Sequence, residues 1–579
     1  MFYQLIEQLR IDTLQQSLPL IGAELTLTFA ILLILLCRML PVLEKIDAVW
    51  LAIVGVVAAL IALRPFQPWA VNAEGATTPV AMGDLQPTEL FTGMLTHDGF
   101  AIAIKTLLLF FLLLFFVLTK VTRLAAKYDS TDFVVLALGS TLGMFMMVAS
   151  NHMIMVFMGV EMASVPSYVM VALQRRNRKA SEAALKYAVY GAGAAGVMLY
   201  GISLLCGVLN SAHLPTMATR LSEVLAADSG SSEILVLALG GLMLGVGLSF
   251  KLSAFPFHFW CPDVFEGATS EVNAFLSVAS KAAALALLVR VAIGFTTLPA
   301  QPEQVARQDK PAVEQVVTDP SEVQLVNFVD AKQADDAKPT ETLAPARKFV
   351  CLLVAVIAVA TCTFGNLAAY AQTNIKRLLA YSTIAHAGYM MMAVPAAIAV
   401  AEVSQDSARQ AIAYLALYAV IYLFMNLGAF AAVAFVREAV GSDEIKDYAG
   451  MLRRSPTLAI CLTLILVSLI GLPPLAGFIG KFAIFAAIAQ AWNQTSYPFL
   501  MLLLVAGGLN TAISLFYYLR IAKVMTIDGE SDETAPMQKP IGMIQNGYLA
   551  LVTAPLVLLM FNWDFLNAWL LEAVSHILT

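Results

Sequence analysis

The chain has 579 residues, of which 60% are hydrophobic and only 13% are charged. Soluble domains contain about 45–50% apolar and about 25% charged residues, so the composition excludes an ordinary soluble protein and predicts one embedded in a bilayer. The formal net charge of −6 is small, and no basic stripe of the kind that binds nucleic acid is present.

Continuous apolar runs recur along the chain, each close to the roughly 20 residues needed to cross the hydrocarbon core. Because they are continuous rather than alternating, they disfavour a β-barrel. They predict an all-α integral membrane protein with about fourteen transmembrane helices. Residues 1–16 lack the basic segment of a cleavable signal peptide, so we expect the first run to remain as a helix. The runs begin near Pro19, Ile46, Phe100, Thr131, His152, Glu182, Ile234, Val272, Lys348, Arg377, Ala411, Pro456, Phe499 and Gly547.

Two of these runs carry proline close to a lysine, at Phe250–Pro256 and Gly471–Lys481. Proline interrupts helical hydrogen bonding, and interrupted helices at matching places in two halves of a chain indicate a transporter's working site. We therefore predict two inverted five-helix repeats, helices 4–8 and 9–13, each with a broken helix. The predicted segments are 1–130 (helices 1–3), 131–296 (first repeat), 297–347 (a polar external insertion), 348–525 (second repeat) and 526–579 (helix 14).

Lysine and arginine gather in every second connection, for example at Lys120 and Arg123 and at Arg453 and Arg454. The alternate connections have few, except for the long segment 297–347, whose length removes its influence on orientation. The positive-inside rule then places the basic connections in the cytoplasm and both chain termini on the outside.

Glu161, Lys251 and Lys281 each lie within an apolar run. A charge at that depth costs several kcal/mol unless it is paired or hydrated, and such residues mark ion pathways in membrane proteins. A buried lysine can gain and lose a proton near neutral pH, which an arginine cannot. We interpret these residues as carriers of protons; the structural alternative is a set of charges that hold helices together.

Lys481, in the second interrupted helix, would extend this into a row of titratable groups. Lys105 and Lys120 lie nearer helix ends, where snorkelling explains a membrane lysine. Lys186 begins a helix and has Glu182 at i−4, so it is either part of the row or a local ion pair. His386 has the natural pKa of a proton relay, with a hydrogen-bonded core histidine as the alternative.

The six cysteines form no CxxC pair, which disfavours zinc and iron–sulfur sites. We therefore expect no redox cofactor and no metal in this chain. The stretch Gly191–Gly196 has part of a dinucleotide-binding spacing, but it lies inside an apolar run and indicates close helix packing instead.

Five segments together resemble the N subunit of bacterial NADH–quinone oxidoreductase (complex I), a proton antiporter-like membrane subunit. They are Met158–Tyr168, Ser181–Tyr187, Phe250–Gly267, Asn374–Tyr389 and Gly471–Phe482. The likeness covers roughly residues 90–525. Larger antiporter-like subunits place histidines in helix 11, where this chain has Tyr418, Tyr422 and Asn426, which favours the N type.

The resemblance implies a proton path in which Glu161 is the helix-5 acid, Lys251 the broken-helix lysine, Lys281 the central lysine and Lys481 the distal lysine. It implies entry from the cytoplasm, exit to the periplasm and energy supplied by quinone chemistry in a neighbouring subunit. It also implies other membrane-arm subunits as partners, a bacterial inner-membrane location, and NADH, FMN, iron–sulfur clusters and quinone for the whole complex. Three alternatives remain: a subunit of a sodium/proton antiporter or membrane-bound hydrogenase, a membrane scaffold, and a stand-alone permease.

Overall fold

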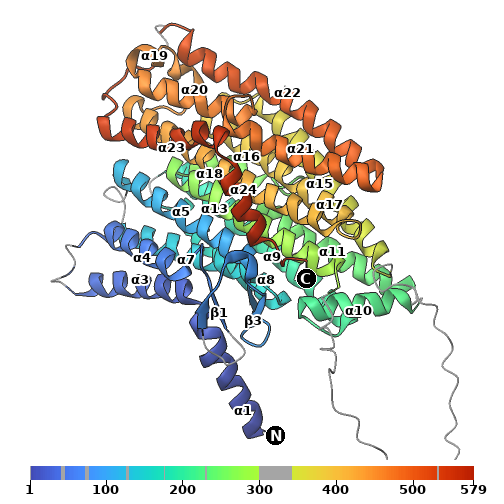
Figure 1. Ribbon diagram of the computed structural model, residues 1–579. Coiled ribbons are helices and arrows are strands. Elements are labelled where there is room, and N and C mark those ends of the chain that lie inside the picture. Colours follow the sequence, from blue (N-terminus) through green and yellow to red (C-terminus); the bar gives the residue numbers. More distant parts are fainter. Residues whose placement is uncertain are drawn as a thin grey trace, which may run out of the picture.

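The computed structural model describes residues 2–40, 43, 46–71, 77–124, 130–174, 177–227, 231–298, 342–530 and 534–578. Its long helices lie side by side in one bundle (Figure 1). Among the described residues, twelve helices are long and apolar enough to cross a membrane, and two shorter apolar helices, Ala48–Leu63 and Pro456–Ile470, lie with them. Every predicted apolar run coincides with one of these helices. The all-α membrane fold is therefore confirmed, and the number of crossings stays a prediction.

The first half of the bundle runs from the N-terminus to the end of α13. Its helices are α1 (Phe2–Ile11), α2 (Leu18–Leu20), α3 (Gly22–Met39), α4 (Ala48–Leu63), α5 (Gly99–Val121), α7 (Ser130–Ala149), α8 (Met153–Val171), α9 (Arg178–Leu209), α10 (Leu214–Ala226), α11 (Ser231–Leu252), α12 (Trp260–Gly267) and α13 (Ser270–Thr296), with the short helical turns η1 (Asp12–Ser17) and η2 (Met82–Asp84).

The second half begins at α15. Its helices are α15 (Ala344–Ala369), α16 (Ile375–Met391), α17 (Ala393–Val400), α18 (Gln405–Val440), α19 (Met451–Arg454), α20 (Pro456–Ile470), α21 (Ala476–Thr495), α22 (Pro498–Thr526), α23 (Met543–Phe561) and α24 (Asp564–Ala573), with the turn η3 (Ile445–Tyr448). The predicted insertion at 297–347 falls almost entirely outside the described residues.

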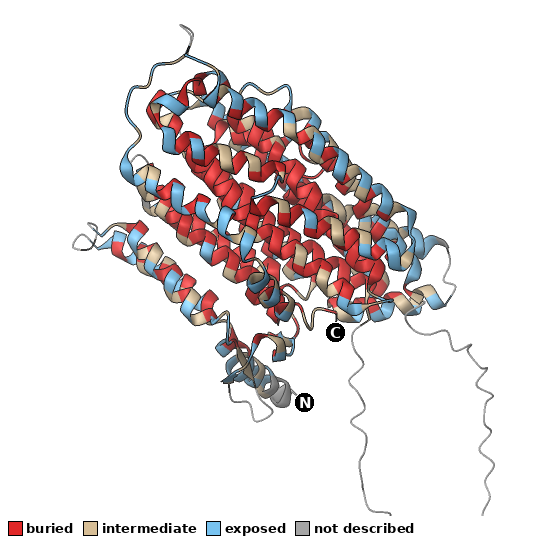
Figure 2. Ribbon diagram, turned by 45° about the horizontal axis from the view of Figure 1, so that its top comes forward, coloured by how far each residue is buried: buried red, intermediate tan, exposed pale blue. Residues whose placement is uncertain are grey.

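The interior of the bundle is buried (Figure 2), and three membrane-length segments are the most buried. In α13, 89% of the residues in its most apolar 18-residue stretch are buried. The same fraction is 100% in the α16–α17 segment and 94% in α18, but only 33% in α9 and in α22. Side chains on the three most buried segments are therefore surrounded by protein, and polar groups there must find their partners inside the protein.

Both predicted helix interruptions are present. The first helix stops at Leu252 and resumes as α12 at Trp260, and the second stops at Ile470 and resumes as α21 at Ala476. Each break contains proline, Pro256 in the first and Pro473 and Pro474 in the second, and proline lacks the backbone N–H that would continue the helical ladder.

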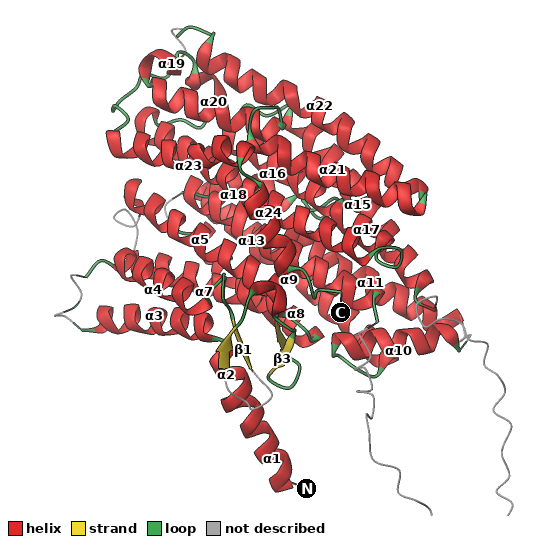
Figure 3. Cartoon of the chain, viewed as in Figure 1, coloured by secondary structure: helices red, strands yellow, loops and turns green. Residues whose placement is uncertain are grey.

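The structure contains elements that the sequence patterns did not predict. Two short antiparallel hairpins, β1 (Trp69–Val71) with β2 (Thr77–Pro79) and β3 (Thr88–Leu90) with β4 (Leu95–His97), lie in the connection before α5 (Figure 3). The helices α10 and α24 were also not predicted. Alternation over three residues is too short to stand out as a strand pattern.

One expectation for a charged residue is wrong. Lys105 does not snorkel: it is 4% exposed, and its Nζ lies 2.6 Å from Oε1 of Glu24 on α3. Snorkelling needs an open path to the membrane surface, whereas the ammonium of Lys105 lies against Glu24 of α3 and the ring of Phe145 on α7.

Candidate functional site

Lys251 lies at the first helix interruption. It is the penultimate residue of α11, is 3% exposed, and donates a hydrogen bond from Nζ to Oγ of Ser164 on α8 at 2.9 Å. Beyond it the chain unwinds, and the N–H of Phe255 finds a replacement acceptor in Oγ1 of Thr361 at 2.9 Å. The interruption thus leaves a buried ammonium with a neutral hydroxyl as its hydrogen-bond acceptor.

Glu161 lies one helical turn before Ser164 on α8 and is half-buried. Its carboxylate interacts electrostatically with the ammonium of Lys251. The side chain that accepts the lysine's hydrogen bond is nevertheless Ser164, which the sequence analysis did not single out. A serine in an apolar helix offers little signal, because its usual role is to bond its own backbone, as Ser164 does to the carbonyl of Val160.

Lys281 lies near the middle of α13 and is 2% exposed. Its Nζ donates to the backbone carbonyl of Thr383 on α16 at 2.9 Å. The acceptor is a neutral carbonyl, so no carboxylate holds this ammonium in its charged form.

His386 lies one turn further along α16 and is buried. Its Nδ1 is 2.7 Å from the hydroxyl of Tyr418 on α18, and its Nε2 is 3.2 Å from the hydroxyl of Tyr518 on α22. Tyr518 in turn is hydrogen-bonded to Ser382. Each ring nitrogen is therefore hydrogen-bonded to a hydroxyl group, and a hydroxyl group can either donate or accept a proton.

Lys481 lies at the second helix interruption. Its Nζ donates to the carbonyl of Ile470, the last residue of α20, at 2.8 Å, and lies 4.5 Å from the centre of the Tyr389 ring. Two glycines make this arrangement possible. Gly471 has φ +87°, and a Cβ on Gly477 would lie 1.8 Å from the carbonyl oxygen of Ser468, so no side chain fits there.

Helix α16 brings three of the predicted residues together. Thr383, His386 and Tyr389 follow one another at intervals of three on one face of the helix, and they contact Lys281, two tyrosines and Lys481 respectively. His386 interacts electrostatically with both lysines. The sequence could not place these groups side by side, because they come from five different helices, α13, α16, α18, α21 and α22.

Lys186 stands apart from this group. Its Nζ lies 2.7 Å from Asp263 on α12 and 2.9 Å from Glu182, and its side chain is 35% exposed. Glu266, Lys179 and Arg377 join the same ion cluster. The predicted pairing with Glu182 is present, and Asp263 is the partner that sequence spacing could not reveal.

Two further buried polar groups were missed. Lys376, at the start of α16, is 1% exposed and pairs with Asp443 at 3.1 Å. Asn366 donates to the hydroxyl of Tyr389 at 3.3 Å and accepts from Tyr517 at 3.0 Å. Lys376 sits at a helix start, where the sequence suggests a solvated charge, so only tertiary packing reveals its burial.

In the part of the chain that the structure describes, no three His, Cys, Asp or Glu side chains lie together in a way that could hold a metal ion. All six cysteines are free thiols.

The bundle resembles known proteins. Residues 150–301 and 340–510 match the family model described as NADH:quinone oxidoreductase/Mrp antiporter, transmembrane. A chain in the structure of the Mrp complex from Dietzia sp. superposes with a TM-score of 0.67 at 14% identity, covering 96% of this chain and 97% of that one, which shows a shared fold. These findings define the class as an antiporter-like membrane subunit.

Closer relatives narrow the class. NADH-quinone oxidoreductase subunit N of Rhodospirillum rubrum is 34% identical over 553 residues, covering 94% of this chain and 95% of the relative. Subunit N of Anaeromyxobacter sp. is 36% identical, covering 78% of this chain and 80% of the relative. A chain of respiratory complex I from Thermus thermophilus is 25% identical, with a TM-score of 0.66 over 94% of this chain and 98% of that one. The chain belongs to the family of NADH-quinone oxidoreductase subunit N.

Proposed function

We propose that this subunit translocates protons in the membrane arm of NADH–quinone oxidoreductase, through Glu161, Lys251, Lys281, His386 and Lys481. The observation that supports this most is the type of partner that each lysine has. Lys251, Lys281 and Lys481 donate to a serine hydroxyl or to backbone carbonyls.

Neutral acceptors leave a buried ammonium free to lose its proton. A carboxylate would stabilise the charged form, while burial alone opposes it. Lys186 and Lys105, by contrast, pair directly with carboxylates, which favours a fixed positive charge. We therefore place Lys186 at the edge of the path, in an ion cluster that faces the surface, rather than within the row.

A proton could pass between Lys281 and Lys481 through His386. The two hydroxyl groups beside His386 provide hydrogen-bond donors and acceptors for this transfer. His386 also interacts electrostatically with both lysines. The driving energy would come from quinone reduction elsewhere in the complex, whose other subunits would hold NADH, FMN, iron–sulfur clusters and quinone. Within the enzyme this chain would be the translocating part, without a redox site of its own.

The proposed orientation in the membrane rests on the basic connections, and each end of the bundle also holds a polar cavity. One, of about 240 Å³, lies between the connections that follow α5, α8, α12 and α18. The other, of about 260 Å³, is lined by the segments before α5, α8 and α10, the end of α13 and the C-terminal residues. Because the basic connections lie at the first end, we assign that end to the cytoplasm and both termini to the periplasm.

The two helix interruptions support the division into repeats at 131–296 and 348–525. In each repeat a lysine lies beside the break: Lys251 just before the first gap and Lys481 soon after the second. Interrupted helices at matching places in two repeats are typical of transporters.

The test is NADH-driven proton uptake by membrane vesicles that carry Lys281→Ala, with assembly checked on a native gel. We expect assembled complex whose quinone reduction and proton uptake both fall by about an order of magnitude or more, since a positioned proton donor contributes roughly 10²–10⁴-fold. Lys523→Ala, at an exposed lysine of α22, is the matched control.

Unchanged uptake per electron at full turnover would favour the scaffold alternative. Uptake that requires Na⁺ in the medium would instead favour sodium as the transported ion. Either result would contradict the proposed proton path through Lys281.

A further inference from the structure

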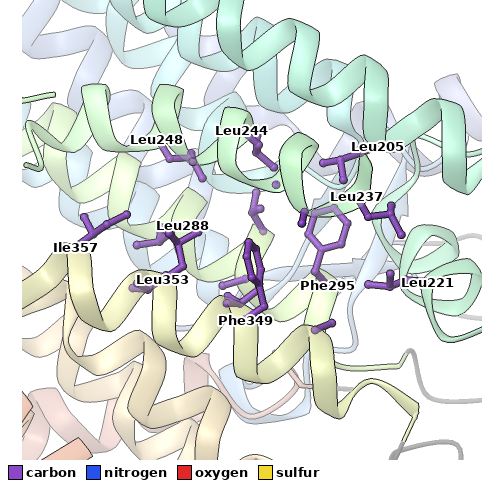
Figure 4. Close-up of a pocket in the computed structure, with 18 of the residues that line it drawn as sticks. Leu205, Leu221, Leu237, Leu244, Leu248, Leu288, Phe295, Phe349, Leu353 and Ile357 are labelled. Carbon is purple, nitrogen blue, oxygen red and sulfur yellow. The ribbon is translucent and has the colours of Figure 1, made fainter. Parts of the chain in front are cut away.

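An apolar groove of about 230 Å³ runs along the side of the bundle between α9, α10, α11, α13 and α15. Figure 4 shows leucine and phenylalanine side chains from these helices pointing into it, among them Leu244 and Leu248 from α11, Leu288 and Phe295 from α13, and Phe349 and Leu353 from α15. The proton path described above uses none of these residues.

The lining gives water no hydrogen-bond partners. Of the side chains that form the groove, only Ser249 carries a polar atom, and the rest are aliphatic or aromatic. Ordered water needs about two to four polar partners, and apolar cavities of this kind are occupied by apolar molecules or stay empty. The groove therefore suits a hydrocarbon.

The groove is about one membrane leaflet deep along α15, and along α11 it continues from Ile234 to Leu252, about 27 Å. Along α15 it extends from Pro345 to Ile357, which is about 18 Å at the helical rise of 1.5 Å per residue. Half of the hydrocarbon core of a bilayer is about 15 Å thick. It is also open sideways, since Ile234 and Phe349 at its edge are 45% and 38% exposed.

Cationic side chains stand at the outer end of the groove, the end at which α10 lies. Lys348 precedes Phe349 on α15, and Arg220 precedes the lining residue Leu221 on α10; both are exposed, and Arg220 also pairs with Glu223 at 2.8 Å. Cations at the level of the membrane surface attract anionic headgroups, by about 1 kcal/mol for each Lys or Arg.

We propose that this groove binds one acyl chain of an anionic phospholipid from the leaflet on the α10 side, with its phosphate near Lys348 and Arg220. The apolar lining, a length that accommodates an extended acyl chain, the side opening and the cations at one end together fit this ligand. A protein helix, about 10 Å or more in diameter with its side chains, is too wide for a space of this volume.

The bound chain would also have a structural role. The inner end of the groove is lined by Ser249 and Leu252, which flank Lys251 at the helix interruption. Hydrocarbon there completes the barrier between the lipid and the unwound segment, so water cannot approach Lys251 from this side. The binding site itself does not depend on the proposed proton path.

The test uses the assembled complex in vesicles of phosphatidylglycerol that carries a photoreactive diazirine in its acyl chain. After illumination, we expect cross-links on the segment from Phe349 to Ile357. Gly245→Phe fills the groove, because a Cβ at Gly245 lies 3.9 Å from Leu353 Cδ2, and we expect it to reduce this labelling several-fold. Gly196→Phe is the matched control, since Gly196 is an exposed α9 glycine whose Cβ would meet nothing within 4 Å.

A second arm tests the headgroup. Labelling by the phosphatidylglycerol probe is expected to exceed labelling by the phosphatidylethanolamine equivalent, and Lys348→Gln is expected to reduce that preference. Absence of cross-links on this segment in the assembled complex would mean that a neighbouring subunit or residues 299–341 cover the groove, and would overturn the proposal. Equal labelling of Gly245→Phe and the unaltered complex, or displacement of the lipid probe by a quinone analogue, would overturn it as well.

Discussion

At the scale of single residues, the chemistry of each buried lysine depends on the atom that accepts its hydrogen bond. The Nζ atoms of Lys281 and Lys481 lie 2.9 Å and 2.8 Å from backbone carbonyl oxygens. The Nζ of Lys105 lies 2.6 Å from a carboxylate. These groups share the same side chain and nearly the same burial, so under the proposed proton path the hydrogen-bond partner is what distinguishes Lys281 and Lys481 from Lys105.

The hydroxyl of Tyr418 is expected to support proton transfer through His386. Tyr418→Phe leaves Nδ1 of His386 without its partner at 2.7 Å, and a buried polar atom without a hydrogen bond costs about 1–3 kcal/mol. We expect assembled complex with a several-fold lower rate of NADH-driven proton uptake. Tyr548→Phe removes a similarly buried hydroxyl that donates to the carbonyl of Leu114, and we expect it to leave the rate unchanged. Equal rates in both variants would argue against a relay at His386.

At the scale of elements, the two helix interruptions depend on local chemistry that sequence reveals well. Proline predicted both breaks within a few residues, because its missing N–H has the same effect in any context. The close contact between the start of α21 and the end of α20 was not predictable, since it depends on which backbone atoms meet across the break. Gly477 is the residue that permits this contact.

Gly477→Ala is expected to disturb the second interruption. A Cβ at this position would lie 1.8 Å from the carbonyl oxygen of Ser468, which forces α20 and α21 apart and moves Lys481 from its acceptor. We expect less assembled complex on a native gel and a lower thermal midpoint of the purified complex. Gly508→Ala, where an added Cβ meets nothing within 4 Å, serves as the comparison. A midpoint for Gly477→Ala equal to that of Gly508→Ala would show that the backbone adjusts without cost.

At the scale of the whole molecule, the first helices are tied to the central bundle by a buried ion pair. Glu24 on α3 and Lys105 on α5 have side chains only 7% and 6% exposed. Removing one member of such a pair leaves the other charge buried and uncompensated, while replacing both with neutral groups is often tolerated. Measurements of thermal stability can therefore detect this pair, because a single replacement should destabilise the protein more than the double replacement does.

Lys105→Met alone is expected to destabilise the folded protein by about 3–5 kcal/mol, seen as a lower thermal midpoint. Glu24→Gln together with Lys105→Met is expected to recover most of that loss. Lys120→Met, which breaks the half-exposed pair with Asp47, is expected to cost only about 0–1 kcal/mol. A double variant as unstable as the single one would show that shape, rather than charge, holds these helices together.

Some properties of the whole molecule were accessible from sequence because they do not depend on what lies nearby. Apolar runs must be helical in lipid, since their backbone groups have no other partners. Glu161, Lys251, Lys281 and Lys481 stood out because charge is costly at membrane depth wherever a helix packs.

Other properties were decided only by tertiary structure, because they depend on neighbours distant in the chain. Packing gave Lys105 a carboxylate, buried Lys376 at a helix start, and set Ser164 beside Lys251. It also left an apolar groove between α11 and α15, helices separated by more than ninety residues of sequence. The sequence thus determined the membrane fold and which charges it must accommodate, whereas the packing of helices determined the partner of each charge, because those partners lie far away in the chain.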